Sequence, residues 1–281
     1  RIKGYLEGSK DPDVTAEVMA WCIKTIPTLG DTNQVNEFVN KLQAGMDYVD
    51  VKELCPSTGM TDIAPLESVV DEGIPKELFR KMQSMKFGKS DAGPGEAALA
   101  ILSTKITYAS DADVDEQGGD ISIDGVGKVE VKGNQGRLGP WTTIDKSLTK
   151  SLAAWNAYKE VKAAAGENMP KGLSVQKLSQ AVPEDFPKEE ILQAIIDDYK
   201  IASFAGNLEI GNPEFRREWN KVCFNAYQAD AGFKGLLLIG QTHYTYAVKA
   251  EQLIDSVRLS PAQVIYKGNQ LRENMPQLFI R

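Results

Sequence analysis

Histidine and cysteine are scarce in this chain, and their scarcity excludes several kinds of site. His243 is the only histidine, which excludes mechanisms that need two, such as that of an HExxH metalloprotease. We interpret His243 as a structural residue. The three cysteines, Cys22, Cys55 and Cys223, lie far apart and form no CxxC pair, which argues against a cysteine zinc site. We expect buried, reduced thiols, as in a reducing compartment.

Long hydrophobic runs are also missing. No stretch approaches the roughly 18 apolar residues of a membrane-spanning helix, and the longest apolar run, residues 236–239, has the length of a strand. We therefore expect no membrane association and a cytoplasmic or viral location, since no signal peptide is visible. The chain begins at Arg1 and not at methionine, so we expect a fragment or a processed chain.

An excess of positive charge is the third feature that the chain lacks. The formal net charge is −7 at pH 7 and the pI is about 5.0. Proteins that coat nucleic acid without regard to sequence are usually basic, because contacts to phosphate supply most of their affinity. The charge therefore argues against a passive DNA-coating protein. It does not argue against an enzyme that gathers carboxylates around cations.

Hydrophobic periodicity predicts helices in the N-terminal third. Apolar residues recur at helical spacing in three segments, 13–25, 32–45 and 75–86. The intervening segment 47–75 is richer in turn signals. We therefore predict an N-terminal helical subdomain or arm over residues 1–87 and a second domain over residues 88–281.

The second domain is predicted to be of the α/β class. A glycine-rich turn leads into a helix that starts at Glu96, and two alternating segments then predict a β-hairpin over residues 120–132. Further helices are predicted over residues 145–165, 188–205 and 213–230, and further strands over 233–240, 244–248 and 263–266. This order of elements indicates a central mixed β-sheet flanked by helices.

The predicted hairpin brings two acidic residues and a lysine together. Glu130 and Lys132 are two residues apart on a strand, so their side chains leave the same face. Asp120 lies on the preceding strand, and a turn at residues 125–127 brings it near Glu130, whereas we interpret Asp124 as a turn residue. Converging carboxylates suit Mg²⁺ or Mn²⁺. A lysine beside such ions can orient or activate a water molecule.

Asp120 followed by Glu130-Val131-Lys132 resembles the PD-(D/E)xK motif of restriction-endonuclease-like nucleases, with Gly119 in place of the proline. Glu96 matches the acidic residue that these enzymes often carry on the helix before the hairpin. The resemblance extends over about residues 90–245. It implies a restriction-endonuclease-like core for this part of the chain.

The resemblance also implies a divalent-metal-dependent nuclease that hydrolyses phosphodiester bonds of DNA, with Mg²⁺ or Mn²⁺ as the cofactor. The expected metal ligands are Asp120, Glu130, Glu96 and Val131. The expected catalytic residues are Glu96, Asp120, Glu130, Lys132 and Gln135, the last at a position where some lineages carry a polar site residue. Contacts to DNA are expected from three residues in and after the second strand, Lys128, Asn134 and Arg137.

Two other functions stay open. The first is a catalytically inactive protein with the same fold, which binds DNA or acts as a structural component of a homo-oligomer or a larger assembly, viral or otherwise. The second is a structural protein in which Glu130 and Lys132 form only a surface ion pair of little energetic worth. The complete set of acidic residues and lysine favours the enzyme, since an inactive module does not need all four side chains.

Overall fold

The computed structural model describes residues 12–85, 93–108, 119–138, 149–167, 190, 213–259, 263–267, 270–274 and 278–280. The chain divides into two compact units. Unit 1 consists of Arg1–Gly136, Ala231–Val257 and Phe279–Arg281, and unit 2 of Arg137–Asp230 and Arg258–Leu278. Among the described helices, none combines the length and the apolar character needed to cross a membrane.

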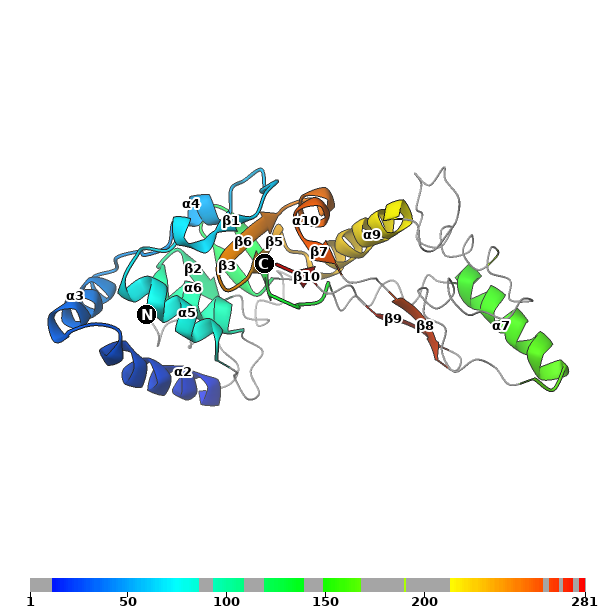
Figure 1. Ribbon diagram of the computed structural model, residues 1–281, viewed down its shortest axis with the longest axis horizontal. Coiled ribbons are helices and arrows are strands. Elements are labelled where there is room, and N and C mark those ends of the chain that lie inside the picture. Colours follow the sequence, from blue (N-terminus) through cyan, green and yellow to red (C-terminus); the bar gives the residue numbers. More distant parts are fainter. Residues whose placement is uncertain are drawn as a thin grey trace. The chain divides into compact units, whose positions relative to one another are not determined.

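Unit 1 is built on a mixed six-stranded sheet with the strand order β1-β6-β5-β4-β3-β2 (Figure 1). The strands are β1 (Ala64–Pro65), β2 (Ile106–Tyr108), β3 (Ile121–Ile123), β4 (Gly127–Gly133), β5 (Gly235–Ile239) and β6 (His243–Ala247). Strand β4 pairs with β5 in parallel, and every other neighbouring pair is antiparallel. The predicted α/β class with a mixed sheet flanked by helices is therefore confirmed.

The helices of unit 1 begin with recognisable start signals. They are α2 (Pro12–Thr25), α3 (Thr32–Gln43), α4 (Val51–Leu54), α5 (Ile74–Gln83), α6 (Pro94–Leu102) and α10 (Ala250–Ser256), with short 3₁₀ helices η1 (Ile26–Thr28) and η2 (Leu66–Ser68). Helix α3 has a capping box in which Asp31 and Gln34 bind each other's backbone amides at 2.9 and 3.0 Å. Helices α5 and α6 each carry a proline in the first turn, where its missing amide proton costs nothing.

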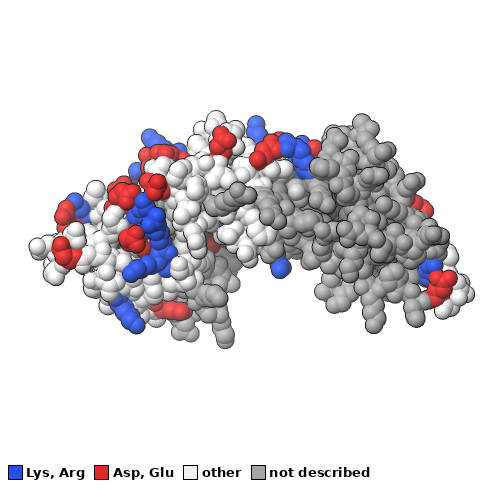
Figure 2. Space-filling model, in the orientation of Figure 1, with Lys and Arg blue, Asp and Glu red and all other residues white. Residues whose placement is uncertain are grey.

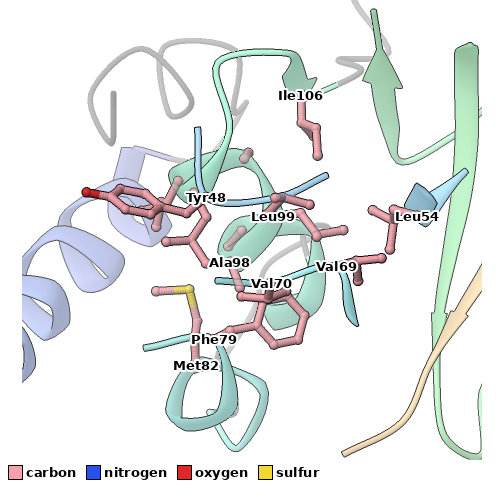
Figure 3. Close-up of a cluster of buried hydrophobic side chains, with 14 of the residues drawn as sticks. Tyr48, Leu54, Val69, Val70, Phe79, Met82, Ala98, Leu99 and Ile106 are labelled. Atoms are coloured by element: carbon pink, nitrogen blue, oxygen red, sulfur yellow. The ribbon is translucent and has the colours of Figure 1, made fainter. Parts of the chain in front are cut away.

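One hydrophobic core joins the N-terminal helices, α5, α6 and one face of the sheet. Figure 3 shows Phe79 and Met82 of α5 pointing toward Val70 and toward Leu99 of α6, and α5 and α6 pack side by side (Figure 1). Side chains on both sides of residue 87 thus share a core. The division into units accordingly falls at Gly136 and does not follow the boundary expected at residue 87.

Two glycines lie close to side chains of the sheet. A Cβ atom on Gly95 of α6 would lie 3.8 Å from Ile239 Cδ1 and 4.0 Å from Val131 Cγ1, so the start of this helix lies directly on β4 and β5. A Cβ atom on Gly235 would overlap the ring and hydroxyl of Tyr246 on the neighbouring strand. The contacts of Gly95 place the start of α6 on β4 and β5, near the end of β4 that carries Lys132.

Unit 2 contains helices α7 (Thr149–Ala164) and α9 (Pro213–Ala231), whose last residue is counted in unit 1. A hairpin is formed by β8 (Gln263–Lys267) and β9 (Gln270–Asn274), and β7 (Arg258–Leu259) pairs with β10 (Leu278–Phe279). The helices predicted over 145–165 and 213–230 are confirmed. The helix predicted over 188–205 lies outside the described residues, apart from Glu190.

Candidate active site

Strands β3 and β4 bring Asp120 and Glu130 to adjacent positions. Ile121 pairs with Val129 in the antiparallel ladder, so Asp120, the residue just before β3, lies opposite Glu130. The backbone amide of Asp120 donates to the Val129 carbonyl at 3.0 Å, and the backbone amide of Val131 donates to Asp120 Oδ2 at 2.8 Å. Directly opposite residues of a ladder share a face of the sheet. The hairpin therefore holds both carboxylates on one side of β4.

The backbone at Gly119 explains why glycine precedes Asp120. Its φ is +87°, a conformation that L-residues rarely adopt. A Cβ atom there would lie 3.1 Å from both Lys128 Cβ and the Val129 amide nitrogen. Proline, whose ring holds φ near about −65°, cannot take this conformation. Glycine at position 119 is thus a requirement of this backbone.

Lys132 and Glu130 form an ion pair that is largely removed from solvent. Lys132 Nζ donates to Glu130 Oε1, and the two side chains are 20% and 6% exposed. The alternative of a solvated surface pair is therefore wrong for these residues. Removing one partner of such a pair leaves a buried charge without compensation, which is strongly unfavourable.

Glu96 enters the same site from the first turn of α6, which begins at Pro94 and not at Glu96 as predicted. Glu96 is 5% exposed, and its Oε2 atom is buried without a hydrogen-bond partner among the described residues. A backbone hydrogen bond from Gly93 partly stabilises its charge. A buried carboxylate oxygen without a partner is costly, so it marks a position where a ligand can bind.

The pKa values of two carboxyl groups in this site are raised. The pKa of Glu96 is raised to about 9, first by burial and then by the charge of Asp120. Burial also raises the pKa of Asp120, to about 7, with Glu130 as the next cause, while Lys132 and the Val131 amide act in the opposite direction. Carboxyl groups that crowd together without enough positive charge retain protons. A cation would remove this penalty.

Hard cations fit this donor set in part. No group of three or more His, Cys, Asp or Glu side chains in the portion of the chain that the structure describes is arranged to hold a metal ion. Mg²⁺, however, usually keeps several water ligands and takes one or two carboxylates from the protein. Asp120 and Glu130 supply two such carboxylates side by side, and the Glu96 oxygen without a partner supplies another acceptor nearby.

The remaining predicted residues lie around β4. Lys128 shares a strand face with Glu130 and Lys132 by the alternation of side chains. The Val131 side chain lies in the core, and its backbone amide is used by Asp120. Gln135 is exposed, with a φ of +69°, in a turn closed by a 2.8 Å bond from the Gly136 amide to the Gly133 carbonyl.

The two residues expected to contact DNA after β4 differ in their surroundings. Asn134 Oδ1 accepts a 3.2 Å hydrogen bond from the Ile280 amide, so part of its side chain anchors the C-terminal segment. Arg137 is exposed and is the first residue of unit 2. The contacts of Gly93 and Ile280 could not be predicted from the sequence, because both are made by backbone atoms.

Neither a family model, nor a curated protein, nor a solved structure matches the chain. Function therefore has to be inferred from the site itself. The structure brings together Glu96 from the first turn of α6, Asp120 from the residue before β3, and Glu130 and Lys132 from β4. This set combines oxygen ligands for a hard cation with a lysine beside them.

Proposed function

We propose that the protein is a divalent-metal-dependent nuclease with a restriction-endonuclease-like core that hydrolyses phosphodiester bonds of DNA. One observation carries the proposal: Glu96, Asp120 and Glu130 converge in a poorly exposed site, where Lys132 is the basic side chain paired with Glu130. Their carboxylates outnumber the positive charge available within the set. A divalent cation, Mg²⁺ or Mn²⁺, would supply the missing positive charge.

Asp120 and Glu130 are proposed to hold the ion, with Glu96 as a further acceptor. When bound, such an ion polarises the phosphodiester and lowers the pKa of a water molecule. The Val131 amide fixes one oxygen of Asp120, so the carboxylate keeps its orientation without a ligand. Preorganisation of this kind reduces the reorganisation needed during the reaction.

Lys132 is proposed to orient or activate the attacking water and to stabilise negative charge on the phosphate. Its ammonium group lies against Glu130 and is only partly exposed, so its electrostatic effect on a neighbouring group is less screened than at an open surface. Glu130 positions this ammonium group through the same ion pair. Lysine and carboxylate therefore support each other's geometry at the site.

A plasmid assay tests the proposal. Supercoiled plasmid is incubated with the protein in Mg²⁺, Mn²⁺ or EDTA, and the Glu130→Gln variant, purified in the same way, serves as the control for contaminating nucleases. We expect nicked or linear DNA with either ion and intact plasmid with EDTA or with the variant. Binding of DNA without cleavage in both ions would favour the inactive DNA-binding protein. Equal cleavage by the parent and by Glu130→Gln would contradict the assigned site.

A further inference from the structure

A pocket away from the candidate site residues lies in unit 1, between η2, the first turns of α5 and the turn that leads into β6. Its volume is about 150 Å³. Leu66, Val70 and Phe79 give it an apolar lining, and Lys76, Arg80 and His243 add basic side chains. The volume suits a small group such as a single phosphate.

The basic residues of this pocket are not equally available to a ligand. Lys76 Nζ binds Glu67 at 3.0 Å and Glu72 at 2.7 Å, so its charge is compensated by two carboxylates. Arg80 makes a single ion pair among the described residues, from Nη1 to Glu77 at 3.3 Å, and its side chain is 43% exposed. Figure 2 shows basic side chains gathered over the region of α5. Arg80 thus has guanidinium N–H groups available for an anion.

His243 supplies a second polar group. Its Nδ1 atom lies 2.8 Å from Thr242 Oγ1, and no hydrogen bond of its Nε2 atom is found within the described segments. The acidic residue that lines the pocket, Glu67, is held by Lys76, and its pKa is lowered first by that hydrogen bond and also by the charges of Arg80 and His243. Because Glu67 is held by Lys76, the guanidinium group of Arg80 and the ring of His243 are the groups of the lining that we consider for contact with an anion.

The pocket lies at the same end of the sheet as the candidate active site. Gly133, the last residue of β4, pairs with Ile239, the last residue of β5, and the turn 240–242 follows directly. His243, the part of the pocket that lies on β6, is two strands away from β4, which corresponds to roughly 10 Å across the sheet. Phosphates of one DNA strand follow one another at about 3.4 Å along the duplex axis. This separation therefore corresponds to a few nucleotides.

We infer that this pocket binds a phosphate group of the DNA strand, a few nucleotides from the bond that is cut. The inference rests on the proposed nuclease function. Arg80 is the principal anion-binding residue, and the His243 ring provides a further polar contact. The pocket places the DNA strand along the sheet end and carries no part of the chemistry.

The single histidine provides a direct test, because the imidazole signals in a proton NMR spectrum of the parent protein all belong to His243. The protein is titrated with a short DNA duplex in Ca²⁺, and separately with inorganic phosphate against sodium chloride at matched ionic strength and fixed pH. We expect saturable shifts of the His243 signals with DNA and weaker, saturable shifts with phosphate. Saturation by phosphate with no response to DNA would assign the pocket to free phosphate and overturn the inference.

Two variants on the same helix supply the matched comparison. Arg80→Gln removes a charge that lines the pocket, whereas Lys81→Gln removes an exposed charge one residue away. Arg80→Gln should abolish the response of the His243 signals to phosphate and weaken DNA binding about five- to tenfold. It should also reduce the slope of log affinity against log salt concentration by about one, the value of one lost phosphate contact. Lys81→Gln should change affinity less than about twofold.

Equal effects of Arg80→Gln and Lys81→Gln on affinity and on the His243 signals would overturn the inference. The outcome is separate from that of the nuclease proposal. Metal-dependent cleavage without any His243 response to DNA would reject the pocket and leave the nuclease intact. A saturable His243 response that Arg80→Gln removes, in a protein that never cleaves, would support the pocket and reject the nuclease.

Discussion

The Asp120 carboxylate accepts a 2.8 Å hydrogen bond from the backbone amide of Val131, across the two strands of the hairpin. The regular pairing of β3 with β4 ends at Ile121 and Val129, so the Val131 amide has no backbone partner on β3. The Asp120 side chain provides the missing acceptor. Asp120 therefore has a structural role in addition to its proposed metal-binding role. Substitutions at this position must separate the two.

Asp120→Asn should remove metal-dependent cleavage while the fold is retained. Asparagine keeps an oxygen that can accept from Val131 but lacks the charge needed to hold a cation, so we expect the nicking rate in Mg²⁺ to fall at least about a hundredfold. Asp124→Asn, an exposed change in the turn of the same hairpin, should have little effect. Comparable rates for the two variants, with matching circular dichroism spectra, would show that Asp120 is not a site residue.

Lys132→Ala should impair the chemical step more than DNA binding. Loss of a contact that acts mainly in the transition state lowers the rate with little change in ground-state affinity, and we expect a decrease of about a hundredfold in single-turnover cleavage at saturating Mg²⁺. Lys132→Arg should not restore the rate, because arginine does not deprotonate and presents its donors differently.

Lys128→Ala is the matched control for Lys132, since it removes a lysine from the same strand face. It should weaken DNA binding slightly and leave the single-turnover rate nearly unchanged. Parallel measurements of affinity and of single-turnover cleavage distinguish the roles. If Lys132→Ala cleaves bound DNA at the parental rate, Lys132 has no part in the chemistry.

Glu96→Gln should make the metal-free protein more stable at high pH. A carboxyl group whose folded pKa is raised, from 4.5 to about 9 for Glu96, contributes stability that is complete below the lower value and is lost as pH rises toward the higher one. The parent should therefore lose stability across this window and the variant should lose less. The difference in free energy of unfolding between the variant and the parent should grow by at least about 1 kcal/mol between pH 5 and pH 8, since each pKa unit corresponds to about 1.4 kcal/mol.

Urea denaturation in EDTA at several pH values measures this difference. Glu17→Gln, an exposed change on α2, serves as the control and should follow the parent at each pH. Mg²⁺ should restore part of the stability that the parent loses at high pH, because a cation favours the ionised carboxylates. A gap between parent and Glu96→Gln that stays constant with pH would mean that Glu96 does not titrate in this range.

Gly119→Ala should destabilise the hairpin and reduce cleavage together. Both Gly119 and Gly125 have positive φ values, +87° and +78°, so alanine strains the backbone at either position. Only at Gly119 would the new methyl group press on β4, while nothing lies within 4 Å of it at Gly125. We expect a loss of about 1 kcal/mol for Gly125→Ala and of about 2–3 kcal/mol for Gly119→Ala.

Thermal and urea unfolding of the two alanine variants measure the stability loss, and the plasmid assay measures activity. Cleavage should fall for Gly119→Ala, since the displaced backbone carries Asp120, and should persist for Gly125→Ala. The same stability loss in both variants would mean that the contact with β4 does not constrain this position.

The sequence was most informative about the hairpin. Alternation around Glu130 and Lys132 predicted a strand with both side chains on one face, and the structure has β4 there. The helices 13–25, 32–45 and 75–86 are confirmed within a few residues as α2, α3 and α5. Strand β6 begins one residue before the predicted segment 244–248. These elements carry long periodic patterns, which are the most reliable signal in a single sequence.

Short elements escaped prediction. Strand β1 has two residues, one of them Pro65, and β2 has three, so neither contains enough residues to show alternation. Strand β1 is positioned by pairing with β6, which lies far away in the sequence, and β2 is positioned by pairing with β3. The buried Oε2 atom of Glu96 was equally invisible, because burial follows from how α6 packs on the sheet and not from local sequence.

The parallel pairing of β4 with β5 has a consequence for synthesis of the protein. Lys132 pairs with Leu238, roughly a hundred residues later in the chain, so this pairing is of the slow, non-local kind. A ribosome-bound chain that ends before residue 235 already contains the four site residues but leaves one edge of β4 without its partner strand. Such an edge exposes backbone groups that favour association with other chains. A nascent chain would thus keep this edge of β4 unpaired until β5, roughly a hundred residues after Lys132, had emerged.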